Sequence, residues 1–310
     1  MEFKTLASIV FTAFLILTCN TDHGKEEGVQ HEKIEYRLQL ESLKEASIKA
    51  AITKDFGKIE KQYTDDAILM AEYQPTIEGR ETIALYYNEI FKRQQIKSYT
   101  KEITEIINLD STFIEIGIFK KVFLEADTDT EQVQNGKYWN TWALAKNDSL
   151  KLKGEAFGFF HPIENPNSLL VDLPENGRQA ANNVPLELRA YRALGEKGVQ
   201  ERDGILRAEM YSHDGKFMPF ADTTKTGMSE LQPYLIAYNS GNVKIDSIHT
   251  YTHRYENHQD YILEYSKFYV SWQVPNFSGV TTGKGVRIWK REEDNTLRIF
   301  RQLGSHNHKF

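Results

Sequence analysis

The hydrophobic residues of this chain alternate between helical and strand-like spacing, and the order of these runs occurs twice. In the first half, Leu40, Leu43, Ala46 and Ala50 recur at helical spacing, and Gly57 ends the helix that they predict. A short turn of helix leads to a strand-like run at 67–73. A second helical stripe then follows Gly79, with apolar residues at Ile83, Tyr86, Tyr87, Ile90 and Phe91.

Long strand-like runs complete each half of the chain. In the first half they occupy 99–109 and 113–126, followed by a hairpin at 136–161 around the polar turn 146–149. The second half predicts a helix at 186–194 and a helical stripe at 228–238. Strands at 243–255 and 261–272 and a hairpin at 283–308 follow.

Matching marker residues indicate that the two halves arose by duplication. Gly136, Lys137, Trp142 and His161 recur, at one constant spacing, as Gly283, Lys284, Trp289 and His308. Met70, Gly79 and Tyr86 likewise correspond to Met218, Gly227 and Tyr234. A repeat of this length is a whole domain, so we expect two domains at 36–163 and 184–310. Between them, 164–183 reads as a linker rich in proline and asparagine.

The N-terminal segment predicts export and a lipid anchor. An apolar run at 6–17 follows Lys4 and has the length of a signal peptide, which places residues 1–18 outside the mature chain. Cys19 is the only cysteine and stands just past this run, an arrangement that resembles a bacterial lipobox. The alternative is an ordinary secreted protein with a stray thiol. Residues 19–35 are polar and read as a flexible tether. We expect an envelope protein, with the outer membrane as the favoured location.

Composition narrows the classes of partner. The chain has 310 residues, of which 40% are hydrophobic and 26% are charged, as in ordinary globular proteins. Its net charge of -6 argues against binding to nucleic acid or to anionic lipid surfaces. The sequence lacks His-Glu-x-x-His, Gly-x-Ser-x-Gly and Walker-type motifs, so metalloprotease, serine hydrolase and nucleotide-dependent functions lose their usual support. No cofactor is predicted.

Two stretches resemble the nuclear transport factor 2-like superfamily, and more narrowly its SnoaL-like and ketosteroid-isomerase-like domains. They are YTDDAILMAEYQPTIEGRETIALYY at the start of the first copy and GKGVRIWKREEDNTLRIFRQLGS at the end of the second. The resemblance covers about residues 36–162 and 184–310. It implies an α+β fold of two tandem cone-shaped domains, each a curved antiparallel sheet wrapped on about three N-terminal helices. It also implies pairing through the sheets, as an intramolecular pseudo-dimer or a homodimer.

Enzymes of this superfamily use a cavity between sheet and helices, with a carboxylate as general base. Glu115 and Glu264 are the candidate acids, because each lies in an apolar strand run at equivalent positions of the two copies. Pairing with Lys120, Lys121 or Lys267 is the structural alternative. Tyr86, Trp142 and Trp289 are candidate ligand contacts, although filling a core is the commoner role of strand aromatics.

A second cluster is specific to the second copy. Strand alternation places His249, Tyr251, His253 and Tyr255 on one face, where the first copy has Lys101, Ile103, Glu105 and Ile107. The two histidines would lie about 13 Å apart, too far to hold one metal ion. With Tyr265 and Arg287 they could line a polar pocket. His253 is then a further candidate base, and exposed histidines are the alternative.

A metal site is not predicted. His306 and His308 have suitable spacing, but no carboxylate or third histidine is near them in the sequence. The sequence therefore favours a membrane-tethered lipoprotein whose domains bind a small, partly apolar molecule, with the principal site in the second domain. An isomerase, cyclase or hydratase that uses a pocket carboxylate or histidine is the first alternative. A scaffold that docks another envelope protein is the second.

Overall fold

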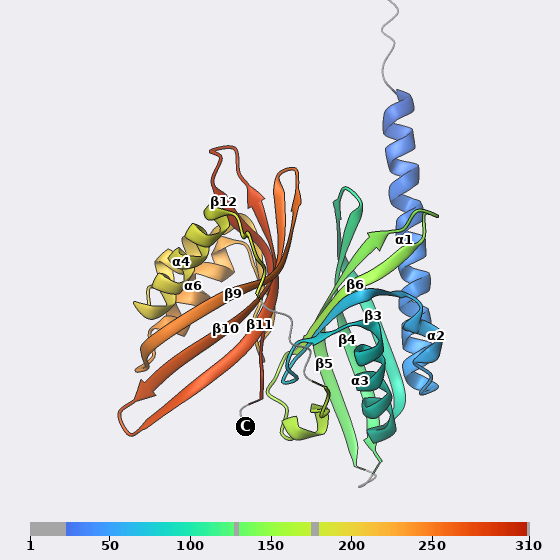
Figure 1. Ribbon diagram of the computed structural model, residues 1–310, viewed down its shortest axis with the longest axis horizontal. Coiled ribbons are helices and arrows are strands. Elements are labelled where there is room, and N and C mark those ends of the chain that lie inside the picture. Colours follow the sequence, from blue (N-terminus) through green and yellow to red (C-terminus); the bar gives the residue numbers. More distant parts are fainter. Residues whose placement is uncertain (1–22, 127–129, 175–179, 309–310) are drawn as a thin grey trace, which may run out of the picture. The chain divides into compact units, whose positions relative to one another are not determined.

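The computed structural model describes residues 23–126, 130–174 and 180–308 (Figure 1). The chain forms two compact units, Met1–Ser42 and Leu43–Phe310, and the second unit holds nearly all of both copies. The predicted signal peptide and Cys19 lie outside the described residues. Helix α1 spans His23–Ile52, so residues 23–35, which the sequence analysis assigned to a flexible tether, are helical. Within the described ranges, none of the helices is long and apolar enough to span a membrane.

The first copy follows the predicted order of helices and strands. After α1 come α2 (Gly57–Glu60), β1 (Tyr63–Ala71), β2 (Ile77–Glu78), α3 (Arg80–Arg93), β3 (Gln94–Leu109), β4 (Thr112–Glu125), β5 (Glu131–Leu144) and β6 (Leu150–Phe159). The sheet order is β2-β1-β6-β5-β4-β3. The four long strands β3 to β6 are antiparallel, as predicted, whereas β1 pairs with β6 in parallel.

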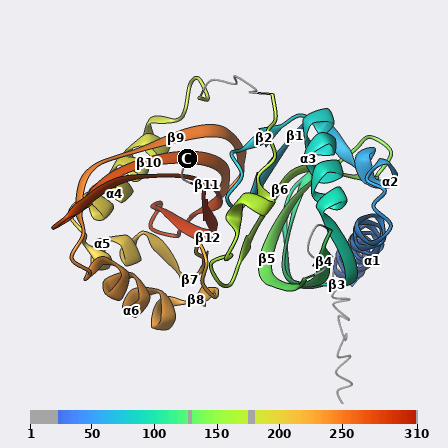
Figure 2. The same ribbon diagram turned by 90° about the horizontal axis from the view of Figure 1, so that it is seen from below.

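The second copy repeats this topology. Its elements are α4 (Leu186–Gln200), α5 (Gly204–Glu209), β7 (Tyr211–Met218), β8 (Lys225–Thr226), α6 (Met228–Asn239), β9 (Lys244–His258), β10 (Tyr261–Val274), β11 (Phe277–Arg291) and β12 (Leu297–His306). The sheet order β8-β7-β12-β11-β10-β9 matches the first copy strand for strand. Figure 2 shows α4 and α6 on one face of this sheet. The predicted α+β fold with two tandem copies is confirmed.

Backbone geometry and packing explain two of the marker pairs, both of them glycines. Gly79 and Gly227 have φ of 85° and 70°, which only glycine adopts readily, and they stand immediately before α3 and α6. Gly136 lies under the ring of Phe119, and Gly283 lies under Phe268 in the same way; a Cβ there would come within 2.6 Å and 2.3 Å of those rings. The glycine that opens each hairpin is therefore a packing requirement of the sheet.

The two sheets pack face to face within the unit Leu43–Phe310. A shared apolar cluster includes Ile116 and Trp139 from the first copy and Leu263 and Val286 from the second. The Tyr265 hydroxyl, buried in this cluster, donates to Thr141 Oγ1 across the junction at 2.8 Å. The outer face of each sheet therefore buries the outer face of the other.

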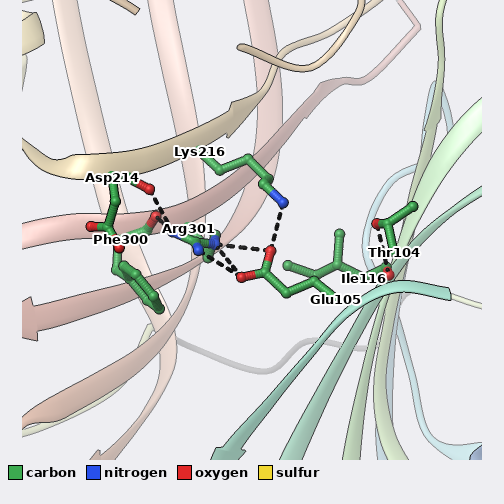
Figure 3. A network of polar contacts seen from close by, with 7 residues as sticks. All are labelled: Thr104, Glu105, Ile116, Asp214, Lys216, Phe300 and Arg301. Carbon is green, nitrogen blue, oxygen red and sulfur yellow. Dashed lines mark hydrogen bonds and ion pairs between the residues drawn. The ribbon is translucent and has the colours of Figure 1, made fainter. Parts of the chain in front are cut away.

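A charged cluster of Glu105, Arg301 and Lys216 joins the copies beside this apolar surface (Figure 3). The Glu105 carboxylate accepts from Arg301 Nη2 at 2.6 Å and from Lys216 Nζ at 2.6 Å. All three side chains are largely removed from water, so the charges compensate one another where each alone would be costly.

The linker is packed onto the first copy over its described N-terminal part. Residues Pro166–Leu169 form a 3-10 turn, and Leu169 and Val171 are buried. The Gln74 side chain donates to Val171 O and accepts from Val171 N, at 3.1 Å and 2.9 Å. Side-chain contacts thus hold a segment that composition alone marks as a loop.

Candidate functional site

A cavity of about 80 Å³ lies in the first copy, between the inner face of its sheet and helices α1 and α3. One water needs about 10–15 Å³ of such space, so the cavity has room for a small organic group. Its walls are mostly aromatic and aliphatic side chains, and its polar side chains include Tyr63, Tyr99, Lys101, Lys121, Gln134 and Glu155. We treat this cavity as the candidate site because it combines apolar walls with a few converging polar groups.

The strand register explains which side chains reach the cavity. On β4, alternate residues point toward the helices, so Phe119 and Lys121 share the inner face. Lys121 pairs with Tyr99 on β3 and Gln134 on β5, and these three form one row across the sheet. The next row holds Phe119, with Lys101 beside it on β3 and Gly136 beside it on β5.

A tyrosine–carboxylate pair provides one polar wall. The Tyr63 hydroxyl donates to Glu155 Oε2 at 2.6 Å. Burial, reinforced by the adjacent Glu155 carboxylate, raises the pKa of Tyr63 well above its ordinary value. The phenol therefore keeps its proton at neutral pH and remains a hydrogen-bond donor.

Two lysines provide the opposite polar wall. The Lys101 ammonium lies 4.9 Å from the centre of the Tyr138 ring and 5.6 Å from that of Tyr99. Burial on its own would lower the pKa of Lys101, but Tyr99, Glu155 and Glu115 outweigh it and raise the pKa. The pKa of Lys121 is instead lowered to about 7, first by burial and then by the Lys101 charge.

Glu115 lies beside the cavity and is fully engaged in hydrogen bonds. Its Oε1 accepts from the Tyr138 hydroxyl at 2.8 Å, and its Oε2 accepts from Trp142 Nε1 at 2.8 Å and Asn140 Nδ2 at 3.3 Å. Burial raises the pKa of Glu115, while these donors and Lys101 act in the opposite direction. The predicted pairing with Lys120 or Lys121 is wrong; a tryptophan and a tyrosine satisfy the carboxylate.

Glu264 has an equivalent environment in the second copy. It accepts from Trp289 Nε1 at 2.8 Å and from the Thr252 hydroxyl at 2.6 Å. Arg287 Nε lies 3.7 Å from Glu264 Oε2, and its guanidinium lies over the Trp289 ring. Glu115 and Glu264 are thus held in matching tryptophan–glutamate contacts, an arrangement that favours a structural role in the sheet.

The predicted pocket around the β9 histidines is wrong. His253 occupies a bulge, where the register with β10 shifts between Thr252 and Arg254. His249 and Tyr251 are exposed, whereas Tyr255 lies on the helix side and donates to Asn183 O.

The remaining members of that predicted pocket are also separated. His253 is buried and pairs with Glu78 of the first copy, with 2.8 Å between its Nε2 and Oε1. Tyr265 lies in the junction between the sheets, and Tyr251 borders a surface hollow beside residues 180–184. Of the predicted ligand contacts, Tyr86 lines the first-copy cavity.

The terminal histidines pack against aromatic rings. His306 stacks on Phe220 with 4.1 Å between ring centres, and the His308 ring meets Tyr73 edge-on. Among the described residues, no group of three or more His, Cys, Asp or Glu side chains is placed to hold a metal ion.

The two copies differ in the ionisable side chains of their inner faces. The Tyr63–Glu155 pair recurs as Tyr211–Gln302, where the Tyr211 hydroxyl donates to an amide oxygen at 3.1 Å. The strand register places Thr250 and Val270 of the second copy at the positions of Lys101 and Lys121. The equivalence of His249 with Lys101 that the sequence suggested is therefore wrong by one residue. The second copy therefore has neutral groups where the first has Lys101, Lys121 and Glu155.

Sequence reasoning missed Tyr63, Tyr99, Lys101, Lys121 and Glu155 as site residues. It considered Lys121 only as a possible partner of a buried acid, and Lys101 only as a first-copy counterpart of the β9 histidine face. A residue-by-residue comparison of the inward positions of the two copies would have found them, because Lys101, Lys121 and Glu155 are charged in one copy alone.

No family model and no curated protein matches this sequence. Among solved structures, the chain is similar to a ketosteroid isomerase-like protein from Erwinia carotovora atroseptica SCRI1043, with 17% identity, a TM-score of 0.37, and coverage of 39% of this chain and 94% of that chain. It is also similar to ActVI-ORFA from Streptomyces coelicolor, with 14% identity, a TM-score of 0.34, and coverage of 40% and 96%. Ketosteroid isomerase-like proteins, the group that the sequence motifs resemble, are thus among the matching structures, and each match spans about one copy.

Proposed function

We propose that the first copy binds a small, partly apolar molecule in its cavity, and that a lipid on Cys19 tethers the chain to a membrane of the cell envelope. The observation that carries the first part is the cavity itself, with aromatic walls and polar groups at both ends. Burial of apolar ligand surface against such walls contributes about 25 cal/mol per Å². The Tyr63–Glu155 pair would orient a ligand that offers a hydrogen-bond donor or acceptor.

Mass spectrometry of bound small molecules tests the binding proposal. Ser47 is half-buried and lines the cavity from α1, so Ser47→Phe should fill the cavity from its helical side. Ser47→Ala removes the hydroxyl and keeps the cavity open. We expect a small molecule to copurify with the mature chain and with Ser47→Ala, and to be lost from Ser47→Phe. Equal occupancy of Ser47→Phe, with its melting temperature unchanged, would rule out this cavity as the site.

Metabolic labelling tests the anchor. The Cys19→Ser chain should incorporate no labelled fatty acid and should leave the membrane fraction, because a lipid chain requires the thiol. Labelled lipid on that variant would refute the anchor and leave the cavity proposal intact. Fractionation of the wild-type chain between inner and outer membranes tests the expected outer-membrane location.

General-base catalysis is the second candidate function. The short Tyr63–Glu155 hydrogen bond within the cavity favours it, since a carboxylate beside a donor can take a proton from a bound carbon acid. If the copurifying molecule is a substrate of this kind, incubation in D₂O should introduce deuterium at carbon, and Glu155→Gln should abolish the exchange. A molecule that binds without any exchange would leave binding alone as the function.

A further inference from the structure

The second polar wall of the cavity contains Lys121, an ammonium group that contacts no carboxylate of the described residues. Lys121 donates to the amide oxygen of Gln94 at 2.8 Å and lies 5.1 Å from the centre of the Phe123 ring. Over the described part of the chain, none of its contacts is with a carboxylate. Lys101, by contrast, interacts electrostatically with Glu155 and Glu115. A half-buried ammonium without a counter-ion is costly, so this wall favours an anion.

The charges of the cavity are also ordered along it. Glu115 on β4, Asn140 on β5 and Glu155 on β6 form one row across the sheet. Lys121 lies on the same face of β4, three alternate positions further along the strand and beyond Phe119. An anionic group placed near Glu155 would be repelled, whereas one placed at Lys121 would be attracted. The cavity therefore prefers one orientation of a ligand that has an acidic end and an apolar body.

The chemistry of the wall selects the kind of anion. A single unmatched ammonium, with Gln94 and Gln134 as its polar neighbours, suits one negative charge. A phosphate or sulfate ester would carry three strong acceptor oxygens, for which charge-assisted recognition needs several cationic donors. The remainder of the cavity is aromatic and aliphatic. These features together describe a monocarboxylate with an apolar body.

We infer that the ligand of this cavity is a small carboxylic acid with an aromatic or aliphatic body, bound as its anion with the carboxylate at Lys121. The inference rests on the proposed function and specifies its ligand class. Lys121 is a specificity residue in this scheme, and the rings of Phe119 and Tyr138 contact the ligand body. The second copy has Val270 in place of Lys121, so it should lack this preference.

The affinity should depend on pH because the pKa of Lys121 is about 7. Below pH 7 the amine is charged and binds the anion. Above pH 7 it loses its proton in the free protein, so affinity should fall by up to about tenfold per pH unit. The ionisable groups that face this site come from β1 (Tyr63), β3 (Tyr99, Lys101), β5 (Tyr138), β6 (Glu155) and α3 (Tyr86, Tyr87). Of these tyrosines, burial raises the pKa values of Tyr63, Tyr86, Tyr87 and Tyr99, so these four stay neutral across this range.

Equilibrium dialysis of the full mature chain with matched acids and amides tests the inference. The probes are phenylacetate, trans-cinnamate and octanoate, each beside its primary amide, which has the same shape without the charge. At about pH 6, at least one acid should bind about tenfold or more tightly than its amide. Lys121→Met should abolish that preference while retaining amide binding. Lys120→Met, an exposed neighbour on the same strand, should leave it unchanged.

Lys121→Arg keeps the test informative if the methionine variant fails to fold. Arginine stays charged at all relevant pH values, so this variant should retain the acid preference and lose the decline above pH 7. Acids and amides that bind equally to the wild-type chain would overturn the inference and leave the proposed function standing, as would an acid preference that survives Lys121→Met. Failure of every probe to bind would overturn both.

Discussion

At the scale of single residues, the main structural surprise concerns the two buried glutamates. The sequence identifies Glu115 and Glu264 as unusual and Trp142 and Trp289 as recurring, but it assigns them to separate roles. The strand register brings each pair together, because Glu115 faces Asn140 on β5 and Trp142 is two residues further on the same face. An indole N–H then reaches the carboxylate in both copies. Sequence patterns identify inward positions, but cross-strand partners depend on the register.

Replacement of these glutamates tests their structural role. In Glu115→Gln or Glu264→Gln, the amide places N–H groups among donors and leaves at least one buried donor without an acceptor. Each change should lower the free energy of unfolding by about 1–3 kcal/mol in urea titrations. The exposed Glu102 on β3 provides the control, and Glu102→Gln should have little effect. A stability loss confined to one copy would show that the two contacts are not equivalent.

At the scale of strands, matching bulges in β3 and β9 decide which side chains face the junction between the sheets. Strand runs and turns follow from the alternation of the sequence, and all four long strands of each copy were predicted. The bulges were not, because one extra residue leaves the composition of the run unchanged. In β3 the register shifts between Ile103 and Glu105, and in β9 it shifts at His253.

These bulges turn the following side chains to the junction between the sheets. Glu105 therefore meets Arg301 instead of sharing a face with Lys101, and Arg254 reaches Asp66. The same feature removed His253 from the predicted pocket. Strict alternation was thus correct up to each bulge and wrong beyond it.

The glycines under the phenylalanine rings allow a prediction for the long hairpins. An alanine Cβ at Gly136 would lie 2.2 Å from Gly158 O and 2.6 Å from the Phe119 ring, and at Gly283 it would be similarly close to Ser305 O and Phe268. Gly136→Ala and Gly283→Ala should each destabilise the protein by about 1–3 kcal/mol, since the sheet must shift to admit the methyl group. Gly304→Ala is the control, because its nearest neighbour lies at 3.8 Å. Thermal unfolding of the three variants would contradict this account if all had the same midpoint.

At the scale of the whole described unit, duplication has produced two sheets with one shared core and different inner faces. The outer faces form a common apolar cluster. The His253–Glu78 contact and the Lys153–Glu256 ion pair cross the junction as well. Marker residues at constant spacing were sufficient to predict the duplication. They could not identify the copy whose inner face has the ionisable groups, since both copies keep the same framework residues and differ at inward positions that are not markers.

The junction also buries a charged group of Glu72, Lys137 and Lys284. All three side chains are at most 1% exposed. Lys137 donates to Phe159 O at 2.6 Å and to Asp222 O at 2.9 Å, and Lys284 donates to the Asn307 side chain at 2.9 Å. Glu72 Oε2 accepts from Phe159 N, while its Oε1 is buried without a hydrogen-bond partner. Burial raises the pKa of Glu72 to about 7 against the attraction of the two lysines.

This group should make the stability of the protein depend on pH. Because the folded-state pKa of Glu72 lies above its ordinary value of 4.5, the folded protein holds this proton more tightly than the unfolded chain. The stabilisation is complete below about pH 4.5 and is lost as pH rises to about 7. Glu72→Gln mimics the protonated acid, so it should match the wild-type protein at low pH and exceed its free energy of unfolding by roughly 3 kcal/mol at pH 7. Urea unfolding across this range measures the difference. If Glu72 were ionised throughout, the free energies of unfolding of the wild-type protein and of Glu72→Gln would change in parallel with pH. The free energy of unfolding of the exposed-site variant Glu102→Gln should parallel that of the wild-type protein in either case.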